Sequence, residues 1–434
     1  MKVRLPFDAI TPLRAGWVLP LALFAIPLVL VAADWPQFRG PDRNNVSTAL
    51  EGIRTMPAGG WPVRWRKPVQ YGWASPVVVD GRVYVFDAEL LDPKSRERIH
   101  CFDAVSGETL WTFAYEANYA EWVFQEAQRS GPSATPLIEN GRLYCLGACG
   151  VVHCLDATTG AVRWRRDLGE DFEIRQMQCR ASPLIEGGLL ILLPGGRPGA
   201  CLVALDRETG ATVWQSLDEE VSNSSPVAIT AGTVRQIVAW TGDSVAALNP
   251  STGGVLWRVP VKTSNNDDIA TPVSDGGNLL VSGLMLRLDG SNPPVPLWPD
   301  KLVGTKHVLS NTCTPFLREA FVYGARTRGE LVCLRADSGE SVWETDEVTE
   351  PKSGASVHLF PAGGDRFFLY NDQGELILAE LSPAGYREIG RSRIIEPTSP
   401  FAGLRAWVPP AFADGNVFAR NDREVVRITL PGDP

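Results

Sequence analysis

The sequence predicts an all-β protein, namely an eight-bladed β-propeller of four-stranded antiparallel blades whose ring is closed by an N-terminal strand. Three observations lead to this prediction. One eleven-residue pattern recurs along the chain, a second marker precedes each copy, and the composition is rich in Trp, Gly and Pro. With 14 Trp, 41 Gly and 34 Pro among 434 residues, the chain favours short strands joined by tight turns. We expect residues 34–434 to form one propeller domain.

The first 33 residues have the pattern of an export signal. Arg4 and Arg14 precede an uncharged stretch from Ala15 to Ala33 that ends in small residues, as in a secretory signal peptide. The stretch is also close to the length of a membrane span, so an uncleaved N-terminal membrane anchor is the alternative. In both cases we expect the rest of the chain to be exported, to the periplasm or cell envelope, with membrane contact only through this segment.

The repeated pattern ends in a Gly and then, four residues later, a Trp. Five copies are clear: CFDAVSGETLW (101–111), CLDATTGAVRW (154–164), ALDRETGATVW (204–214), ALNPSTGGVLW (247–257) and CLRADSGESVW (333–343). Worn copies occupy residues 286–298 and 380–389. Where an Asp begins the turn, its side chain can bond backbone amides while the Gly takes the left-handed conformation. A unit of 40 to 50 residues is typical of a propeller blade.

A small residue followed by Pro marks the start of six of the units. Seven full units begin at Ser75, Thr135, Ser182, Ser225, Thr271, Thr314 and about Ser356. An eighth unit, from Val408 to about Leu430, has only three strands. Residues 63–66 match the Trp-bearing strand without the three strands before it. We therefore predict that residues 63–66 complete the eighth blade and close the ring, which leaves no open sheet edge.

The Gly-to-Trp turn and the opening Asp-Trp-Pro-Gln-Phe-Arg-Gly-Pro at residues 34–41 resemble the pyrroloquinoline-quinone-like (PQQ-like) propeller repeat family. The resemblance covers essentially all of residues 34–434 and is specific for the fold. The family includes quinoprotein alcohol and glucose dehydrogenases, the propeller subunit of the bacterial outer-membrane protein assembly machine, and exported proteins of unassigned role. The resemblance therefore implies a fold and leaves several functions open.

Dehydrogenase chemistry would need features that this chain largely lacks. Similarity to the quinoprotein dehydrogenases implies an adjacent Cys pair over the quinone, but no two Cys are adjacent here. It also implies calcium held by Glu and Asn side chains, with an Asp as base. The residues suited to a hard cation are Asn265, Asn266, Asp267 and Asp268, for which a solvated loop is the alternative. We expect no catalytic residues and no firm cofactor, with PQQ and calcium as the alternative.

Cys145 and Cys154 are a disulfide candidate. A two-residue turn at Cys149-Gly150 would place them opposite each other on a rung without hydrogen bonds, where Cα atoms approach to about 4.5 Å. That separation is at the short end of the range for disulfides. We predict adjacent sulfur atoms and leave their oxidation state open.

Binding is expected at the face where the inner strands begin, around the central channel. The residues that reach it mix amides, charges and aromatic rings, which suits a protein partner or a small polar ligand, although an ordinary wet surface has the same composition. The candidates are Trp73, Arg129, Gln178, Arg180, Asn223, His307, Asn311, His358, Arg405 and Trp407. We expect residues 112–132 to form a short amphipathic helix over this rim.

The charge balance narrows the function. A formal net charge of −9 argues against a general nucleic-acid binder, which needs a basic excess. The sequence favours an exported, non-catalytic propeller that binds or scaffolds another molecule. The alternatives are a PQQ-dependent oxidoreductase and a cell-envelope or outer-membrane protein assembly factor.

Overall fold

The computed structural model describes Met1 and residues 33–262, 268–299, 308–400 and 403–430. Most of the candidate export segment lies outside the described residues, as do Asn265, Asn266, Asp267 and His307. Within these ranges no helix combines the length and the hydropathy needed to cross a membrane.

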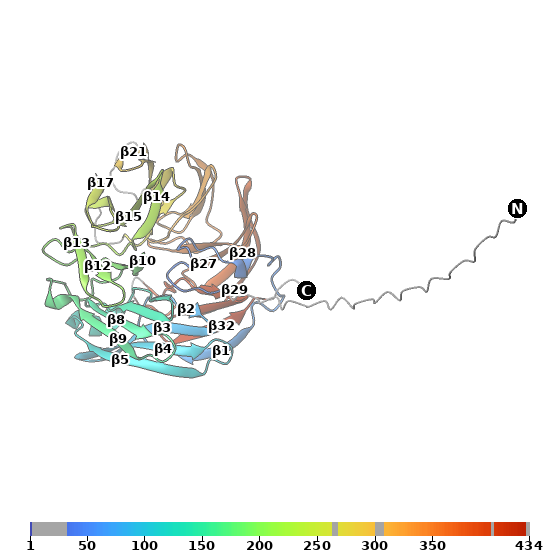
Figure 1. The fold of residues 1–434 in the computed structure, drawn as a ribbon. Coiled ribbons are helices and arrows are strands. Elements are labelled where there is room, and N and C mark those ends of the chain that lie inside the picture. Colours follow the sequence, from blue (N-terminus) through green and yellow to red (C-terminus); the bar gives the residue numbers. More distant parts are fainter. Residues whose placement is uncertain (2–32, 263–267, 300–307, 401–402, 431–434) are drawn as a thin grey trace. The chain divides into compact units, whose positions relative to one another are not determined.

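Eight four-stranded antiparallel sheets form a ring, which confirms the predicted propeller (Figure 1). Blades 1 to 4 contain β2 (Val77–Val79), β3 (Arg82–Leu91), β4 (Lys94–Asp103), β5 (Thr109–Ala117); β6 (Leu137–Glu139), β7 (Arg142–Leu146), β8 (Val151–Asp156), β9 (Val162–Asp167); β10 (Leu184–Glu186), β11 (Leu189–Leu192), β12 (Leu202–Asp206), β13 (Thr212–Ser216); and β14 (Val227–Ala231), β15 (Val234–Trp240), β16 (Ser244–Leu248), β17 (Val255–Pro260).

Blades 5 to 8 contain β18 (Val273–Ser274), β19 (Asn278–Val281), β20 (Leu284–Asp289), β21 (Asn292–Trp298); β22 (Phe316–Arg318), β23 (Phe321–Ala325), β24 (Leu331–Arg335), β25 (Ser341–Thr345); β26 (Val357–Pro361), β27 (Arg366–Asn371), β28 (Glu375–Ser382), β29 (Gly385–Arg393); and β30 (Ala411–Ala413), β31 (Asn416–Arg420), β32 (Glu424–Thr429), β1 (Val63–Pro68). The helical segments of the described chain are four 3₁₀ turns: η1 (Thr48–Leu50), η2 (Glu121–Phe124), η3 (Glu126–Gln128) and η4 (Leu168–Glu170).

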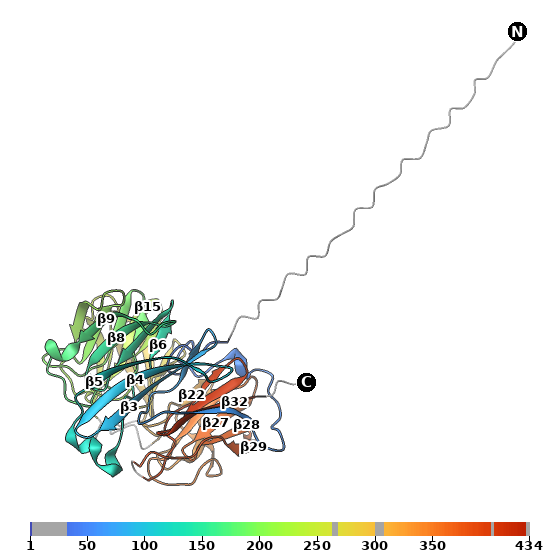
Figure 2. The same ribbon diagram turned by 90° about the horizontal axis from the view of Figure 1, so that it is seen from below.

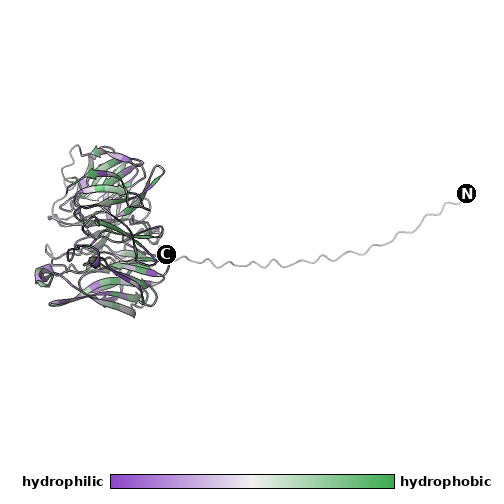
Figure 3. Cartoon of the chain, turned by 60° about the vertical axis from the view of Figure 1, so that its left-hand side comes forward, coloured by the Kyte–Doolittle hydropathy of each residue, from purple (hydrophilic) through white to green (hydrophobic). Residues whose placement is uncertain are grey.

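The first strand of each blade lines the channel. Neighbouring first strands contact one another around the ring, as β2 does with both β6 and β30. Apolar residues are concentrated in the strands (Figure 3), and the buried clusters lie between adjacent blades. Burial of both faces of a sheet against its neighbours is what stabilises a repeated blade.

Closure of the ring follows the prediction. β1 pairs antiparallel with β32, from Trp65 opposite Arg427 to Pro68 opposite Glu424. In Figure 1 the blue β1 accordingly lies beside the red β32. The last sheet thus takes strands from both ends of the propeller, and its otherwise open edge is covered.

The repeated Trp residues join neighbouring blades. Each of five indoles packs on the turn glycine of the next blade, so closely that an added Cβ would come within 2.5–2.8 Å of the ring. These pairs are Trp65–Gly107, Trp111–Gly160, Trp164–Gly210, Trp214–Gly253 and Trp298–Gly339. Several indole N–H groups also donate to a carbonyl of that turn, as Trp214 does to Pro250 at 2.9 Å. The repeated Trp residues therefore serve the packing between blades.

The small residues before Pro form a second set of links between blades. The backbone N–H of one marker donates to the hydroxyl of the next, at 2.9 Å from Ser75 to Thr135 and 3.0 Å from Thr135 to Ser182. The same contact joins Ser182 to Ser225, and Thr271 to Thr314. A hydroxyl at this position satisfies an amide that would otherwise be buried beside the channel without a partner.

The disulfide prediction is wrong. Cys145 lies opposite His153, and Cys154 lies opposite Tyr144, because the hairpin turn has three residues, 148–150, between the paired Gly147 and Val151. A register shift of one residue moves a side chain to the other face of a sheet. Cys145 therefore packs between blades 1 and 2, and Cys154 between blades 2 and 3. All eight Cys are free thiols.

The prediction of an amphipathic helix over residues 112–132 is also wrong. The first part of this segment extends β5 to Ala117, and only the short turns η2 and η3 follow. The aromatic residues Trp111, Phe113 and Tyr115 alternate with exposed positions, which is the period of a strand. β3, β4 and β5 are consequently long and lie side by side (Figure 2).

Candidate functional site

Strand direction places the candidate residues on one face. The first and third strands of each blade run away from the face where the inner strands begin, which we call the channel face, and the second and fourth strands return to it. Connections into the inner strands and the hairpins between second and third strands therefore share the channel face. The turns that carry the repeated Gly lie on the opposite face.

Candidates from blades 1 to 3 make up the first group. The guanidinium of Arg180 lies 5.6 Å from the ring centre of Trp73, and burial lowers the pKa of Arg180. Arg180 Nε also donates to the carbonyl of Met177 at 3.0 Å. Gln178 Nε2 donates to the carbonyls of Pro194 and Gly195, at 2.7 and 3.0 Å. This side-chain amide therefore stabilises the loop that contains Pro194 and Gly195.

The second group comes from blades 4 to 6, where Asp268 and Asn311 are buried and Asn223 is partly buried. Asn311 Nδ2 donates to Asp268 Oδ1 at 2.8 Å, and the Asn311 side-chain oxygen accepts from Ser282 at 2.8 Å. The Asp268 carbonyl accepts from the Asn223 amide at 3.0 Å. The Asn223 backbone N–H and the Asn311 side chain therefore hold these connections together.

The third group lies between blades 7 and 8. Arg405 is buried, forms an ion pair with Asp372, and lies 5.5 Å from the ring centre of Trp407. His358 occupies β26 and lies against the Trp407 carbonyl. Burial lowers the pKa of His358 to about 4, so this imidazole is neutral at pH 7.

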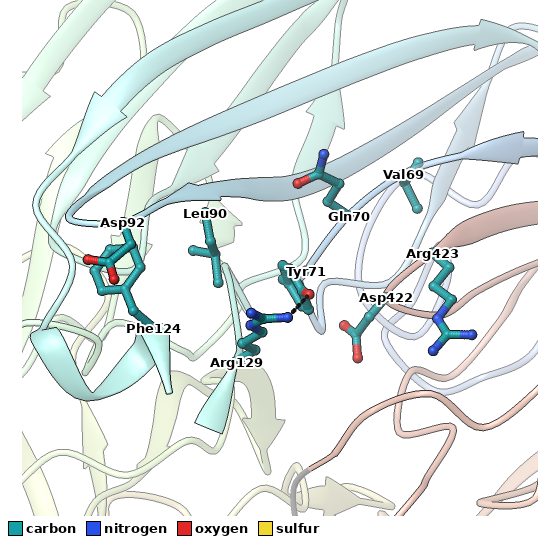
Figure 4. Close-up of a pocket in the computed structure, with 9 residues that line it drawn as sticks. All are labelled: Val69, Gln70, Tyr71, Leu90, Asp92, Phe124, Arg129, Asp422 and Arg423. Atoms are coloured by element: carbon teal, nitrogen blue, oxygen red, sulfur yellow. Dashed lines mark hydrogen bonds between the residues drawn. The ribbon is translucent and has the colours of Figure 1, made fainter. Parts of the chain in front are cut away.

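A pocket of about 560 Å³ opens between blades 8 and 1 on the channel face (Figure 4). Four connections form its walls, and the lining residues are Val69, Gln70, Tyr71, Leu90, Asp92, Phe124, Arg129, Asp422 and Arg423. Of these, sequence reasoning identified only Arg129. The sequence feature that could have indicated the pocket is the extra length of the first unit. Its long β3–β4 hairpin carries Leu90 and Asp92.

The pocket presents both signs of charge beside aromatic surface. Arg129 Nη1 donates to the Tyr71 hydroxyl at 3.1 Å and stacks on that ring at 5.7 Å. Asp422 accepts from the Gly72 amide at 3.3 Å, and burial raises its pKa. Arg423 lies next to Asp422, and Asp92 lies on the far side of Tyr71 (Figure 4). Paired charges around a flat ring suit a polypeptide segment better than an apolar metabolite.

A buried network fixes the pocket wall. Asp87 accepts from Arg98 at 2.8 Å and from the Gln70 amide at 2.6 Å, and His100 Nε2 lies 3.2 Å away. Burial alone would raise the pKa of Asp87, but the hydrogen bonds with His100 and Arg98 outweigh it and hold the pKa well below its ordinary value. Arg420 donates to the carbonyls of Gln70 and Phe86 from the adjacent blade.

The predicted calcium candidates are residues 265–268. Asp268 is the one member within the described residues, and its Oδ1 already accepts from Asn311. The side-chain oxygen of Asn311 is likewise occupied by Ser282. Across the described ranges no three His, Cys, Asp or Glu side chains are grouped closely enough to hold a metal ion. Because Asn265, Asn266 and Asp267 lie outside the described residues, calcium binding there stays a prediction.

Residues 95–345, more than half of the chain, match the model of the family described as outer membrane protein assembly factor BamB. The chain belongs to this family. Outer membrane protein assembly factor BamB from Yersinia pestis is 25% identical over 254 residues, 54% of this chain. The aligned region spans 60% of that relative's length.

Solved structures show the same fold at lower identity. BamB from Moraxella catarrhalis superposes with a TM-score of 0.59 at 18% identity, covering 86% of this chain and 98% of that one. Quinohemoprotein alcohol dehydrogenase from Comamonas testosteroni gives a TM-score of 0.60 at 15% identity, covering 93% of this chain and 81% of that one. The propeller is thus shared by a family of assembly factors and by an enzyme.

Proposed function

We propose that this chain is an exported, non-catalytic propeller that binds a protein partner on its channel face and takes part in the assembly of outer-membrane proteins. Membership of the BamB family carries the proposal. The export signal at residues 1–33 belongs to the same proposal, because such a partner lies in the cell envelope.

The chemistry of the channel face supports a protein partner. Three arginines stack on partly exposed rings: Arg129 on Tyr71, Arg180 on Trp73, and Arg405 on Trp407. Tyr, Trp and Arg dominate the energetically important positions of protein interfaces. Stacking also holds each guanidinium in place, so less side-chain freedom is lost on binding.

The pocket between blades 8 and 1 extends this surface. Its four charged residues can pair with side chains of either sign, and Phe124 and Tyr71 offer apolar area. We therefore propose that the partner's segment enters the pocket while its flanks cover the Arg–aromatic pairs.

Site-directed photo-crosslinking in the producing cell tests the proposal. A benzophenone amino acid replaces Trp407 in one variant of the full chain and Phe124 in another, with Thr158, an exposed turn residue of the opposite face, as control. We expect both channel-face variants to capture a component of the outer-membrane protein assembly machinery, and the Thr158 variant to capture none.

Two results would overturn the proposal. One is capture from Thr158 alone. The other is dye-linked oxidation of alcohols by purified protein supplied with PQQ and calcium, which would favour the quinone-dependent oxidoreductase instead.

A further inference from the structure

The segment of residues 34–50 lies inside the propeller channel. Trp35 pairs with Val78 in β2 through two backbone hydrogen bonds of 2.7 and 2.9 Å. Other contacts reach four more blades: Pro36 to Ile138, Arg43 to Pro183, Asn45 to Leu359, and Ser47 to Phe412. The segment therefore touches the inner edges of blades 1, 2, 3, 7 and 8.

This segment brings two arginines into the channel. Arg39 is 6% exposed and Arg43 is 7% exposed. Arg43 donates to the carbonyls of Pro183 and Ser182, at 2.7 and 3.4 Å, and to Gln37 Oε1 at 3.1 Å. Those two carbonyls precede β10 on the channel face. The Arg43 Nη atoms are thus bound by neutral oxygens alone, and its enclosed Nε has no hydrogen bond.

Arg39 has no such partners. Its guanidinium makes no hydrogen bond, ion pair or ring contact with any residue that the structure describes, and its Nε is fully enclosed. The two Nη atoms are not enclosed in the same way, so they reach accessible space. A buried cation that lacks both a counter-charge and hydrogen bonds is strongly disfavoured, and proteins pair such groups with an anion.

The neighbouring His358 imidazole adds no positive charge to this place at pH 7, because burial lowers its pKa to about 4. His358 lies close enough to Arg39 for the two to interact, and its Nε2 is enclosed without a partner. The carboxylate that influences His358 is Asp372, which is already bound by Arg405, Lys352 and Thr349. The positive charges of Arg39 and Arg43 therefore have no carboxylate within ion-pair distance in the described chain.

The backbone around Arg39 is held in an unfavourable conformation. Arg39, Arg43 and Asn45 have φ of 65°, 55° and 64°, in the left-handed region that L-residues other than Gly rarely adopt. The Asn45 amide donates to the Arg39 carbonyl at 2.8 Å, which fixes the loop. At Gly40, with φ 82°, a Cβ would come within 2.9 Å of the Trp35 ring. The packing thus forces Arg39 into the channel without giving it a partner.

We propose that Arg39, with Arg43 beside it, binds a small oxyanion in the channel, either a carboxylate or a phosphate. A guanidinium presents two parallel N–H donors that match both groups. Burial and the neighbouring Arg43 lower the pKa of Arg39 to about 9, so the side chain is still a cation at pH 7. The site lies within the ring and is separate from the partner surface proposed above.

Calorimetric titration of the full chain tests the site. Inorganic phosphate, sulfate and citrate are titrated separately into protein dialysed into Tris chloride, with potassium chloride of equal ionic strength as the blank. We expect saturable binding of one anion per chain. Tighter binding of phosphate than of citrate would indicate a phosphate site, and tighter binding of citrate would indicate a carboxylate site.

Variants assign the binding to Arg39. Arg39→Gln replaces the cation with a shorter, neutral polar side chain, and we expect at least tenfold weaker binding. Arg39→Lys keeps the charge but loses the pair of parallel N–H donors. Its affinity for the anion should therefore lie between that of the unchanged protein and that of Arg39→Gln. The control is Arg387→Gln, an exposed arginine of the outermost strand β29, which should bind as the unchanged protein does.

The outcomes are decisive in either direction. Binding that is lost in Arg39→Gln and retained in Arg387→Gln supports the site. No saturable binding of any of the three anions, or equal affinity in Arg39→Gln, overturns it. If Arg39→Gln does not fold, the comparison of Arg39→Lys with Arg387→Gln decides the question.

Discussion

The indole of Trp65 lies across Gly107, with its Cδ2 only 2.8 Å from where a Cβ of residue 107 would stand. Trp65 belongs to β1 of blade 8, and Gly107 belongs to the last turn of blade 1. The Trp65 N–H also donates to the carbonyl of Ala104 at 3.1 Å. The contact that joins successive blades along the chain therefore also joins the two ends of the propeller.

Gly107→Ala should destabilise the ring at this closure. The substitution combines strain at φ 71° with a clash against the Trp65 ring. Gly81→Ala is a matched control, because Gly81 has φ 68° but open space around its Cβ. We expect about 1–2 kcal/mol of destabilisation for Gly81→Ala and a further ~1–3 kcal/mol for Gly107→Ala, measured by urea unfolding. Equal losses would mean that the Trp65 contact does not constrain the turn.

His153 should make stability depend on pH between about 6.5 and 4. It is buried between Phe113 and Tyr115, and burial, reinforced by Arg165, lowers the pKa of His153 to about 4. Since the folded protein holds the imidazole neutral, unfolding takes up a proton below pH 6.5, and stability falls as the pH falls towards 4.

His153→Gln removes that proton uptake, so we expect a shallower loss of unfolding free energy over this window. Urea unfolding at several pH values measures the slope. His358 contributes a slope of the same sign, because burial also lowers its pKa to about 4. An unchanged slope in His153→Gln would contradict the assignment.

The thiols should react sparingly in the native protein. Seven of the eight Cys are buried, whereas Cys149 is partly exposed with its Sγ 3.3 Å from the Asn118 carbonyl. Burial raises the pKa of Cys149 to about 12, so even this thiol is mostly protonated at pH 8. We expect at most one slow maleimide addition per native chain and eight in denaturant. Mass spectrometry of non-reduced peptides should find no link between Cys145 and Cys154.

Partner binding should depend on the Arg–aromatic pairs. Trp407→Ala removes the ring under Arg405 while leaving the Arg405–Asp372 ion pair in place, so we expect weaker partner capture with an intact fold. Truncation of a ring at an interface commonly costs about 2 kcal/mol or more. Leu110→Ala is the control, since Leu110 is 47% exposed and follows the Gly107 turn on the opposite face. Equal capture by both variants would place the partner elsewhere.

The sequence alone determined the propeller, its eight blades and the strand that closes it. These follow from local rules, because the turn glycines need positive φ and each Trp needs a neighbouring blade to cover it. It also identified Arg129, Arg180 and Trp407 as channel-face residues, since the connection before each marker must reach that face.

Only the tertiary structure decided the contacts that depend on one residue of register or on distant segments. The turn at 148–150 has three residues, which places Cys145 and Cys154 on opposite faces of the sheet. The turn residues in the sequence do not show whether such a turn has two residues or three. The pocket unites residues from both ends of the chain, such as Tyr71 and Asp422. Arg39 belongs to a short N-terminal motif, and it becomes buried only in the closed ring. No carboxylate of the described residues lies within ion-pair distance of it there. The burial of a side chain and its hydrogen-bond partners depend on residues that are distant in the sequence, so a local sequence pattern does not predict them.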